Sequence, residues 1–366
     1  MIFLLLIYKK LLQFCYFFIK LLPAKKQRIV FLSRQTNKPS IDFQYLINDI
    51  HARYPQYEIN VLCKRMEKDN PKQIFSYLFH PFLQMVLLAR ASICIIDGYQ
   101  IAVSVLKHKK ELKIIQIWHS LAAIKKSGYA SLKTKKEKAI AKIMCMHTNY
   151  DFIVIGAAQM KPFFAQTFNC PYKKFWITGT PSVDYLLASK ESNKILVQKA
   201  YPELKGKKIV LYAPTFRKSN QYRFNELINA FENSEYTLVI KKHPLTKVVI
   251  PEKYTYKKVA TIDFLSSADF VISDYSGTII EAAVIERPIL IFNYDCEEFS
   301  KSEGFFINIE TEFKSMSFKT AEEIADFVKK GVYDMQFLKR FAKKCVENTN
   351  GTCTQTLVDL IMEVNK

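Results

Sequence analysis

Glycine and proline are scarce in this sequence, which has 9 Gly and 13 Pro among its 366 residues. Together with an apolar fraction of 49% and an aromatic fraction of 14%, this scarcity excludes a disordered or low-complexity chain. A chain of this length and composition can bury a core large enough for two domains of ordinary size, or for one large domain.

Cysteine pairs of the Cys-x-x-Cys kind are absent, although the chain contains eight cysteines. Zinc sites and redox motifs commonly use such pairs, so their absence argues against a zinc or disulfide framework. Most of the cysteines stand inside apolar runs, which indicates buried, reduced thiols in a cytoplasmic protein.

Acidic residues are sparse in the first part of the chain. Residues 1–150 contain 8 Asp and Glu against 25 Lys and Arg, whereas the remainder contains 26 against 29. This basic excess predicts an anionic partner, which could be nucleic acid, an anionic membrane or a polyanionic substrate. No recognised nucleic-acid-binding motif coincides with the basic stretches, so we expect no nucleic acid partner.

The apolar N-terminal run is also interrupted by polar residues. Within residues 2–22, four polar side chains share one helical arc of about 100°: Lys9, Lys10, Gln13 and Lys20. This arc predicts an amphipathic helix over residues 1–24 that lies in the membrane interface, with Lys25, Lys26 and Arg28 near the lipid headgroups. A buried core helix and a transmembrane helix are the alternatives, and the missing cleavage site argues against a signal peptide.

Short strand-like and helical runs alternate from Arg28 onward. Strands are expected at residues 29–33, 58–63, 91–96, 113–118, 150–155, 208–212, 237–241, 261–264, 269–273 and 288–292. Helices are expected at residues 41–54, 76–90, 321–330 and 335–346, and in a segment that ends near residue 200. This alternation predicts an α/β protein with parallel sheets. A turn-rich segment at 178–184 marks a boundary, so we expect two doubly wound, Rossmann-like domains facing a cleft, residues 25–183 and 184–366.

Residues 269–283 combine a strand, a polar turn and the start of a helix near Thr278. Unpaired N–H groups and the helix dipole make such a helix start a natural phosphate site, although an ordinary strand-to-helix connection has the same pattern. Glu281 follows one turn into the helix. Its carboxylate is placed to accept hydrogen bonds from ribose hydroxyls, or it simply favours the helix dipole.

Two of the six histidines, His119 and His243, follow the ends of predicted strands, where ligands bind in open α/β sheets. A neutral His119 imidazole could accept a proton from a hydroxyl, with Lys125 and Lys126 attracting an anionic substrate. A histidine that caps the strand end through backbone bonds is the alternative. The other four are expected to be structural or at the surface: His51, His80, His108 and His147.

Two further strand ends carry basic residues. Lys241 and Lys242 precede His243 and Pro244, which together form a reasonable phosphate clamp. Arg217 ends the segment Leu-Tyr-Ala-Pro-Thr-Phe-Arg, and its guanidinium can grip phosphate with two parallel bonds.

The order and spacing of five motifs over residues 90–310 resemble the CDP-glycerol glycerophosphotransferase family, the glycerol and ribitol phosphotransferases of teichoic acid synthesis. These motifs are Trp118-His119 with Lys125-Lys126-Ser127-Gly128, Tyr212-Ala-Pro-Thr-Phe-Arg217, Lys241-Lys242-His243-Pro244, Ser273-Asp-Tyr-Ser-Gly277, and Arg287-Pro288 with Phe292 and Asp295. Two positions depart from the family pattern. Ser120-Leu-Ala-Ala123 replaces Gly-Thr-Pro-Leu after the Trp-His pair, which bears on the acceptor, and Gly277 replaces a serine.

This resemblance implies a glycosyltransferase-B-like fold with an acceptor-side domain at 25–183 and a nucleotide-donor domain at 184–366. It further implies peripheral attachment to the cytoplasmic face of the cell membrane, no cofactor and no active-site metal. His119 would deprotonate the acceptor hydroxyl, and Lys125 and Lys126 would bind the acceptor. The remaining site residues would hold the CDP-linked donor: His243, which is also catalytic, with Arg217, Lys242, Ser276, Gly277, Thr278 and Glu281.

The implied reaction moves glycerol phosphate, or a related polyol phosphate, from the donor to a lipid-linked saccharide or a teichoic-acid-like polymer and releases CMP. Two other classes of protein remain as alternatives. One is a sugar-nucleotide glycosyltransferase of capsule or cell-surface polysaccharide synthesis on the same scaffold, and the other is a basic membrane-binding or nucleic-acid-binding protein without catalysis.

Overall fold

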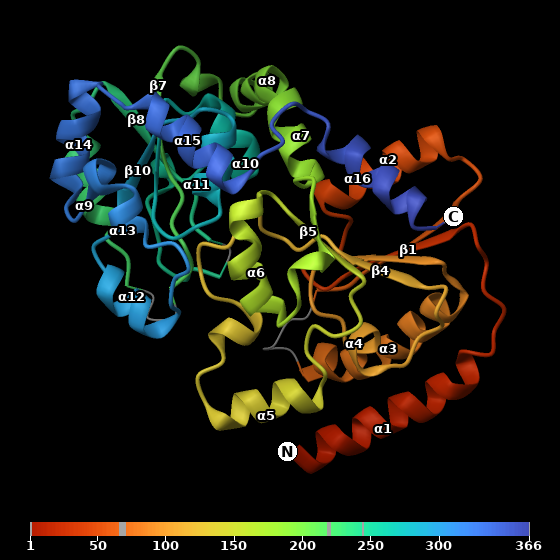
Figure 1. Ribbon diagram of the computed structural model, residues 1–366. Coiled ribbons are helices and arrows are strands. Elements are labelled where there is room, and N and C mark those ends of the chain that lie inside the picture. The colour runs from red at the N-terminus through yellow and green to blue at the C-terminus, as the bar shows by residue number, and fades with distance from the viewer. Residues whose placement is uncertain (1, 66–70, 218–220, 244, 366) are drawn as a thin grey trace. The chain divides into compact units, whose positions relative to one another are not determined.

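The computed structural model describes residues 2–65, 71–217, 221–243 and 245–365. The chain divides into two compact units, each built around one parallel sheet (Figure 1). Unit 1 comprises Met1–Leu121, Ser127–Asp184 and Thr352–Lys366, and unit 2 comprises Ala122–Lys126 and Tyr185–Gly351. The α/β class and the two parallel sheets predicted from the alternating pattern are confirmed.

The described part of unit 1 forms a six-stranded parallel sheet in the order β2-β1-β3-β4-β5-β6. Its strands are β1 (Arg28–Ser33), β2 (Glu58–Cys63), β3 (Ile93–Ile96), β4 (Lys113–Gln116), β5 (Phe152–Ile155) and β6 (Phe175–Ile177). The strand order reverses between β1 and β3. In open α/β sheets, ligands bind beyond the carboxyl ends of the strands at such a reversal, so residues after Ser33 and Ile96 are candidates for the site.

Helices lie between these strands along the chain, and two further helices of this unit follow β6. They are α2 (Ile41–Arg53), α3 (Pro71–Arg90), α4 (Ile101–Val105), α5 (Lys135–Ile143), α6 (Lys161–Phe168), α7 (Pro181–Ala188) and α16 (Cys353–Glu363). Phe43, Leu46 and Ile50 recur at helical spacing on α2 and are buried against Ile29 and Phe31 of β1. Apolar side chains on one stripe of α2 and on a sheet strand therefore form one continuous core.

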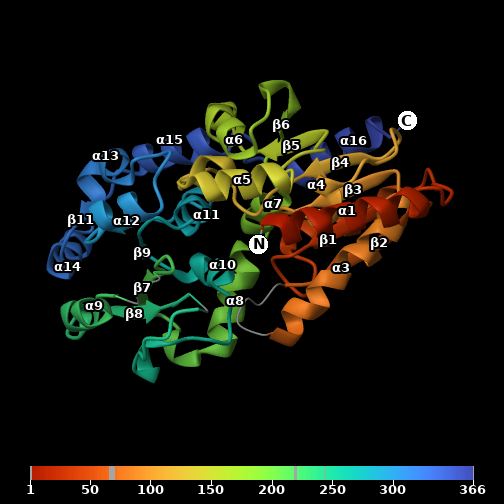
Figure 2. The ribbon, with the colours of Figure 1, turned by 90° about the horizontal axis from the view of Figure 1, so that it is seen from below.

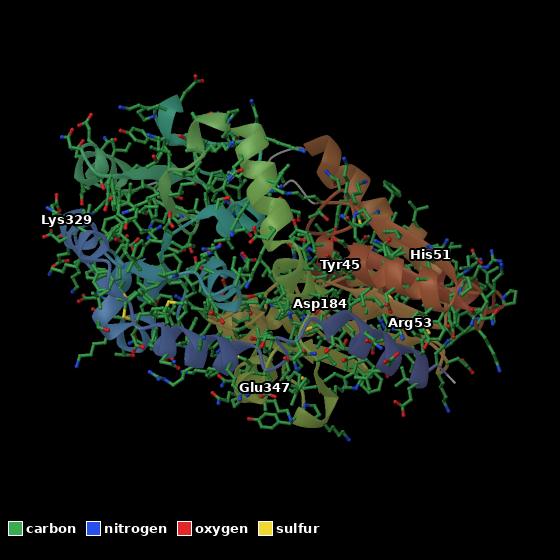
Figure 3. The ribbon with its side chains drawn as sticks, turned by 90° about the horizontal axis from the view of Figure 1, so that it is seen from above. Tyr45, His51, Arg53, Asp184, Lys329 and Glu347 are labelled. Carbon is green, nitrogen blue, oxygen red and sulfur yellow. The ribbon has the colours of Figure 1, made fainter. Side chains whose placement is uncertain are left out.

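The last helix of the chain, α16, returns to unit 1 and packs beside α2 (Figure 3). The Asp184 carboxylate accepts hydrogen bonds from the N–H groups of Cys353 (3.0 Å) and Thr354 (2.7 Å), which caps the start of α16. Arg53 at the end of α2 pairs with Asp359 on α16. Unit 1 thus includes residues 352–366, which the predicted ranges placed with residues 184–351.

The described part of unit 2 forms a five-stranded parallel sheet in the order β11-β10-β9-β7-β8. Its strands are β7 (Lys208–Tyr212), β8 (Tyr236–Ile240), β9 (Phe270–Ser273), β10 (Ile289–Phe292) and β11 (Ser317–Phe318). Its helices are α8 (Lys190–Ala200), α9 (Phe224–Phe231), α10 (Thr261–Phe264), α11 (Thr278–Val284), α12 (Cys296–Ser302), α13 (Ile309–Glu312), α14 (Ala321–Lys330) and α15 (Met335–Cys345). Here the strand order reverses between β7 and β9.

The strand predicted at residues 261–264 is wrong, because this segment forms the short helix α10. A 3₁₀ turn, Leu265–Ser267, continues it. The neighbours Phe264 and Leu265 are both fully buried. Successive strand residues point to opposite faces, so a helical turn places both side chains in the core more readily. A run of four residues is too short to reveal its period.

The N-terminal helix α1 (Ile2–Ile19) packs against α3, α4 and α5 of unit 1, as Figure 2 shows. Most of its polar arc faces the protein, although Lys10 is exposed. Lys9 Nζ donates to the Ile143 carbonyl (2.7 Å), and Gln13 Nε2 donates to the Val105 carbonyl (2.9 Å). Its apolar side is exposed. By length and composition, α1 is the one helix in the described ranges that could cross a membrane.

Candidate active site

Unit 1 carries one group of candidate site residues, at the ends of β3 and β4. His119 Nδ1 lies 2.9 Å from the backbone carbonyl oxygen of Asp97, which follows β3. Gln35 Nε2 lies further from the same nitrogen, at 3.4 Å, so we take the shorter contact as the one that sets the tautomer. A carbonyl oxygen can only accept a hydrogen bond, which places the proton on Nδ1. The other nitrogen of the neutral ring, Nε2, therefore keeps its lone pair and can accept a proton.

The pKa of His119 is lowered from its usual value. Desolvation by the surrounding protein is the main cause, the positive charge of Arg34 acts in the same direction, and the bond to the Asp97 carbonyl acts against them. His119 is therefore neutral at pH 7, as a proton acceptor must be. Arg34 and Asp97 were not singled out in the sequence, because neither belongs to a motif that marks a site.

Unit 2 carries its own group of candidate site residues, at the ends of β7 and β9. The fully buried Asp274 accepts hydrogen bonds from the Thr215 N–H at both carboxylate oxygens (2.9 and 3.0 Å). Ser273 Oγ donates to the Ala213 carbonyl at 2.7 Å. These bonds join the loop after β7 to the turn after β9 at the reversal of strand order, where a ligand site is expected.

The predicted donor turn leads directly into α11. The Ser276 hydroxyl donates to the Thr278 hydroxyl (3.1 Å) and accepts from the Thr278 N–H (3.3 Å). Gly277 is the residue before the helix, and Glu281 lies partly exposed in its first turn. The structure therefore brings Ser276, Gly277, Thr278 and Glu281 together on one turn, and their contacts with a donor remain a prediction.

Arg217 is buried and paired with two carboxylates. Its Nη1 lies 2.7 Å from Asp274 Oδ2, and its Nε and Nη2 lie 2.5 and 2.9 Å from the two oxygens of Asp295. Nη1 also donates to the Thr215 carbonyl at 3.1 Å. Most N–H donors of the guanidinium are therefore bonded within unit 2. The expected contact of Arg217 with a phosphate stays a prediction.

His243 and Lys242 follow β8. The Leu245 N–H donates to His243 Nδ1 at 3.2 Å, so a neutral His243 carries its proton on Nε2, the reverse of His119. Its ring centre lies 5.3 Å from that of Phe216 on the loop after β7. Lys242 Nζ donates to the Val248 carbonyl at 2.8 Å. Residue 244 lies outside the described residues, so the predicted turn at this proline stays a prediction.

Lys125 and Lys126 belong to unit 2, although the residues on either side of Ala122–Lys126 belong to unit 1. Lys125 forms an antiparallel bridge with Phe305, and the Lys126 N–H donates to the Gly304 carbonyl at 3.1 Å. Desolvation lowers the pKa of Lys125, whereas the charge of Asp274 raises it. Lys125 therefore lies in the electrostatic range of the donor turn, and the predicted acceptor contacts of both lysines are untested.

A cavity of about 790 Å³ opens beside this network in unit 2. Its polar lining contains more carboxylates than cations: Asp295, Glu297, Glu298, Glu303 and Glu310 against Arg217, Arg223 and Lys319. This charge balance disfavours phosphate as its occupant. Among the described residues, no group of three or more His, Cys, Asp or Glu could hold a metal ion, and the prediction of a metal-free site remains a prediction.

Comparison with known proteins supplies the family. The profile of the CDP-glycerol:poly(glycerophosphate) glycerophosphotransferases matches residues 14–363. The chain is 26% identical to a teichoic acid ribitol-phosphate primase of Bacillus spizizenii, covering 93% of this chain and 92% of that protein. It is 27% identical to a teichoic acid glycerol-phosphate primase of Bacillus subtilis, covering 82% and 80%.

The fold is also similar to a solved structure, that of the wall teichoic acid polymerase TagF. The two share a TM-score of 0.73 and 18% identity over 93% of this chain and 90% of that one. At this identity the similarity to the solved structure establishes the fold alone. The family profile, in contrast, matches nearly the whole chain and so establishes the family. The chain therefore belongs to the CDP-glycerol:poly(glycerophosphate) glycerophosphotransferase family.

Proposed function

We propose that this protein transfers a polyol phosphate, glycerol phosphate or a relative such as ribitol phosphate, from a CDP-linked donor to a teichoic-acid-type acceptor and releases CMP. The observation that carries the proposal is the Nδ1–H of His119 bonded to the Asp97 carbonyl at 2.9 Å, which leaves Nε2 as a proton acceptor. A neutral imidazole fixed in this tautomer suits deprotonation of a hydroxyl at pH 7. Family membership supplies the donor and the reaction class.

In the proposed reaction, His119 Nε2 takes the proton from an acceptor hydroxyl. The acceptor oxygen attacks the phosphorus that bears the polyol, and the bond from this phosphorus to the bridging oxygen of the pyrophosphate breaks. The bridging oxygen leaves as part of CMP. Positioning and charge stabilisation by protein groups are the main sources of catalysis in phosphoryl transfer of this kind.

Unit 2 would supply the donor contacts. His243 can donate from Nε2 to a phosphate oxygen, because its Nδ1 is engaged by the Leu245 N–H. The turn from Ser276 to Thr278 would contact the pyrophosphate, whereas Lys125 and Lys126 would bind the acceptor. We assign Arg217 the task of holding Asp274 and Asp295, and through them the turn, since its guanidinium is 3% exposed.

We also propose that unit 1 attaches to an anionic membrane through α1 and α3. These helices contact each other, and the Tyr8 hydroxyl on α1 donates to the Leu78 carbonyl on α3 at 2.7 Å. Both present exposed apolar side chains to solvent: Phe3, Leu4, Phe14, Phe17 and Phe18 on α1, and Leu78, Phe79, Leu83 and Val86 on α3. An apolar surface of this kind is typical of an interaction site.

The chemistry around this surface favours lipid as its occupant. Lys9, Gln13 and Lys20 already bond to unit 1, so the apolar side of α1 is the one left to face outward. Lys10, Lys25 and Lys26 are exposed on or just after α1 and can contact anionic headgroups. Attachment at the cytoplasmic face would bring a lipid-linked saccharide or polymer acceptor to the enzyme.

Calorimetry with soluble donors tests the proposed donor class. Purified protein is titrated with CDP-glycerol, CDP-ribitol and a UDP-sugar under identical conditions. We expect binding of at least one CDP-polyol and weaker or no binding of the UDP-sugar. Tight binding of the uridine donor alone would instead assign the protein to sugar-nucleotide glycosyl transfer.

A further inference from the structure

The residue directly before His119 has a strained backbone. Trp118 has φ 59°, in the left-handed region, where a bulky side chain is rare and the cost is about 1–2 kcal/mol. Such strain persists only where the surrounding contacts hold the residue in place. The contacts that hold Trp118 therefore also bear on the orientation of His119.

Gln116 makes the hydrogen bond that holds this backbone. It is the last residue of β4 and is fully buried. Its Oε1 accepts from the Trp118 N–H at 2.9 Å, and its Nε2 donates to the Gly98 carbonyl at 3.2 Å. A side-chain amide suits this place because it offers an acceptor to the N–H and a donor to the carbonyl.

The two hydrogen bonds of Gln116 reach the chain neighbours of His119 and of its partner Asp97. Trp118 precedes His119, and Gly98 follows Asp97, whose carbonyl accepts from His119 Nδ1. The Trp118 ring adds a second constraint, because its centre lies 4.2 Å from that of the imidazole, with the planes 37° apart. One amide therefore links the strand end that carries His119 to the strand end that carries its acceptor.

We propose that Gln116 is a positioning residue that holds His119 against the Asp97 carbonyl and so keeps the imidazole proton on Nδ1. The proposal rests on the proposed function, in which His119 Nε2 accepts the acceptor proton. Without the amide, the Trp118 backbone can leave the left-handed region, and the His119 ring loses its fixed partner. A tautomer with the proton on Nε2 then becomes populated, and it cannot act as the proton acceptor.

The test compares Gln116→Leu with Gln84→Leu. Gln84 is a matched control, since it is also buried in unit 1 and its amide donates to Gln100 (3.0 Å) instead of to the backbone beside His119 or Asp97. Nitrogen-15 NMR of the histidine side chains, assigned with His119→Asn, reports which ring nitrogen carries the proton. Steady-state kinetics with a CDP-polyol donor and thermal unfolding accompany it.

We expect the wild type and Gln84→Leu to show the Nδ1–H form of His119. Gln116→Leu should show a mixture containing Nε2–H, with kcat about 10- to 100-fold lower and the donor KM nearly unchanged. Gln116→Met is the second variant if the leucine variant fails to fold. Its unbranched side chain has no N–H to donate to the Gly98 carbonyl and no amide oxygen to accept from the Trp118 N–H, so the same mixture is expected.

Two outcomes separate this proposal from the proposed function. If the folded Gln116 variants retain both the Nδ1–H form and the wild-type kcat, Gln116 does not position His119, and the function is unaffected. If the wild type itself carries the His119 proton on Nε2, the proton-acceptor role of His119 is overturned, and the role assigned to Gln116 is overturned with it.

Discussion

Arg217 and Asp274 form an ion pair, with Nη1 2.7 Å from Oδ2, that is almost fully removed from solvent, since their side chains are 3% and 0% exposed. Removing one partner of such a pair leaves an uncompensated buried charge, which costs about 3–5 kcal/mol. We therefore expect Arg217→Ala to lower the free energy of unfolding by this amount and to weaken CDP-polyol binding. Urea unfolding and calorimetry measure the two effects.

Arg223→Ala is the matched control for this change. Arg223 is 43% exposed and pairs with Glu226 at the surface, so its loss should cost about 1 kcal/mol or less. If Arg217→Ala is no less stable than Arg223→Ala, the buried pair does not hold the donor turn.

Desolvation, and to a smaller extent the charge of Arg34, should determine the pH at which activity begins to fall in acid. His119 must be neutral to accept a proton, and its lowered pKa keeps it neutral to a lower pH than an ordinary histidine. Arg34→Gln removes one cause of the lowering, so the acidic limb of the kcat/KM profile, which reports the free enzyme, should move to higher pH. Lys38→Gln, an exposed cation of the same loop, should leave the limb in place. An unmoved limb in both variants would contradict this role of Arg34.

His147 should make unit 1 sensitive to acid. Burial lowers its pKa from 6.5 to about 4, with smaller contributions from Arg34 and His119. The folded state therefore binds fewer protons than the unfolded state between these values, and stability falls as the pH falls from 6.5 to 4, by about 3 kcal/mol in all. His147→Asn, which tolerates the left-handed backbone at this position (φ 58°), should lose this dependence in urea unfolding at pH 7 and pH 5. If the stability of His147→Asn falls with pH as much as that of the wild type, His147 is not the source of the acid sensitivity.

The outward face of α1 should govern membrane binding. Phe14 and Phe17 are 65% and 66% exposed, and insertion of each ring into lipid contributes about 2 kcal/mol. The double change Phe14→Glu and Phe17→Glu should therefore weaken binding to phosphatidylglycerol vesicles at least about 100-fold in a sedimentation assay. Val332→Glu is the control, because Val332 is 77% exposed but lies in unit 2. If the double variant and Val332→Glu lose vesicle binding to the same extent, attachment through the apolar side of α1 is contradicted.

Local patterns in the sequence were sufficient to predict most strands and the residues at their ends. β2 and β7 match the predicted ranges, and His119 and the turn after Ser273 follow strands as expected. These features depend on runs of adjacent residues. β4 ends at Gln116, two residues before the predicted end at Trp118, because Trp118 adopts the left-handed backbone.

Features that depend on distant partners were not predictable in this way. Asp274 and Asp295 accept hydrogen bonds from Arg217, but they lie 57 and 78 residues further along the chain, and no local pattern indicates either partner. The polar arc of α1 was found from its helical period, which does not reveal that the arc binds unit 1. The membership of Lys125 in unit 2 likewise follows from its pairing with Phe305.

The most direct test of the proposed function is CMP release from a radiolabelled CDP-polyol in the presence of a lipid-linked acceptor. We predict acceptor-dependent CMP release by the wild type, a loss of about 100-fold or more in His119→Ala, and wild-type activity in His51→Ala, an exposed histidine on α2. Release at the wild-type rate by His119→Ala would contradict the account, because the acceptor hydroxyl would then lose its proton without His119.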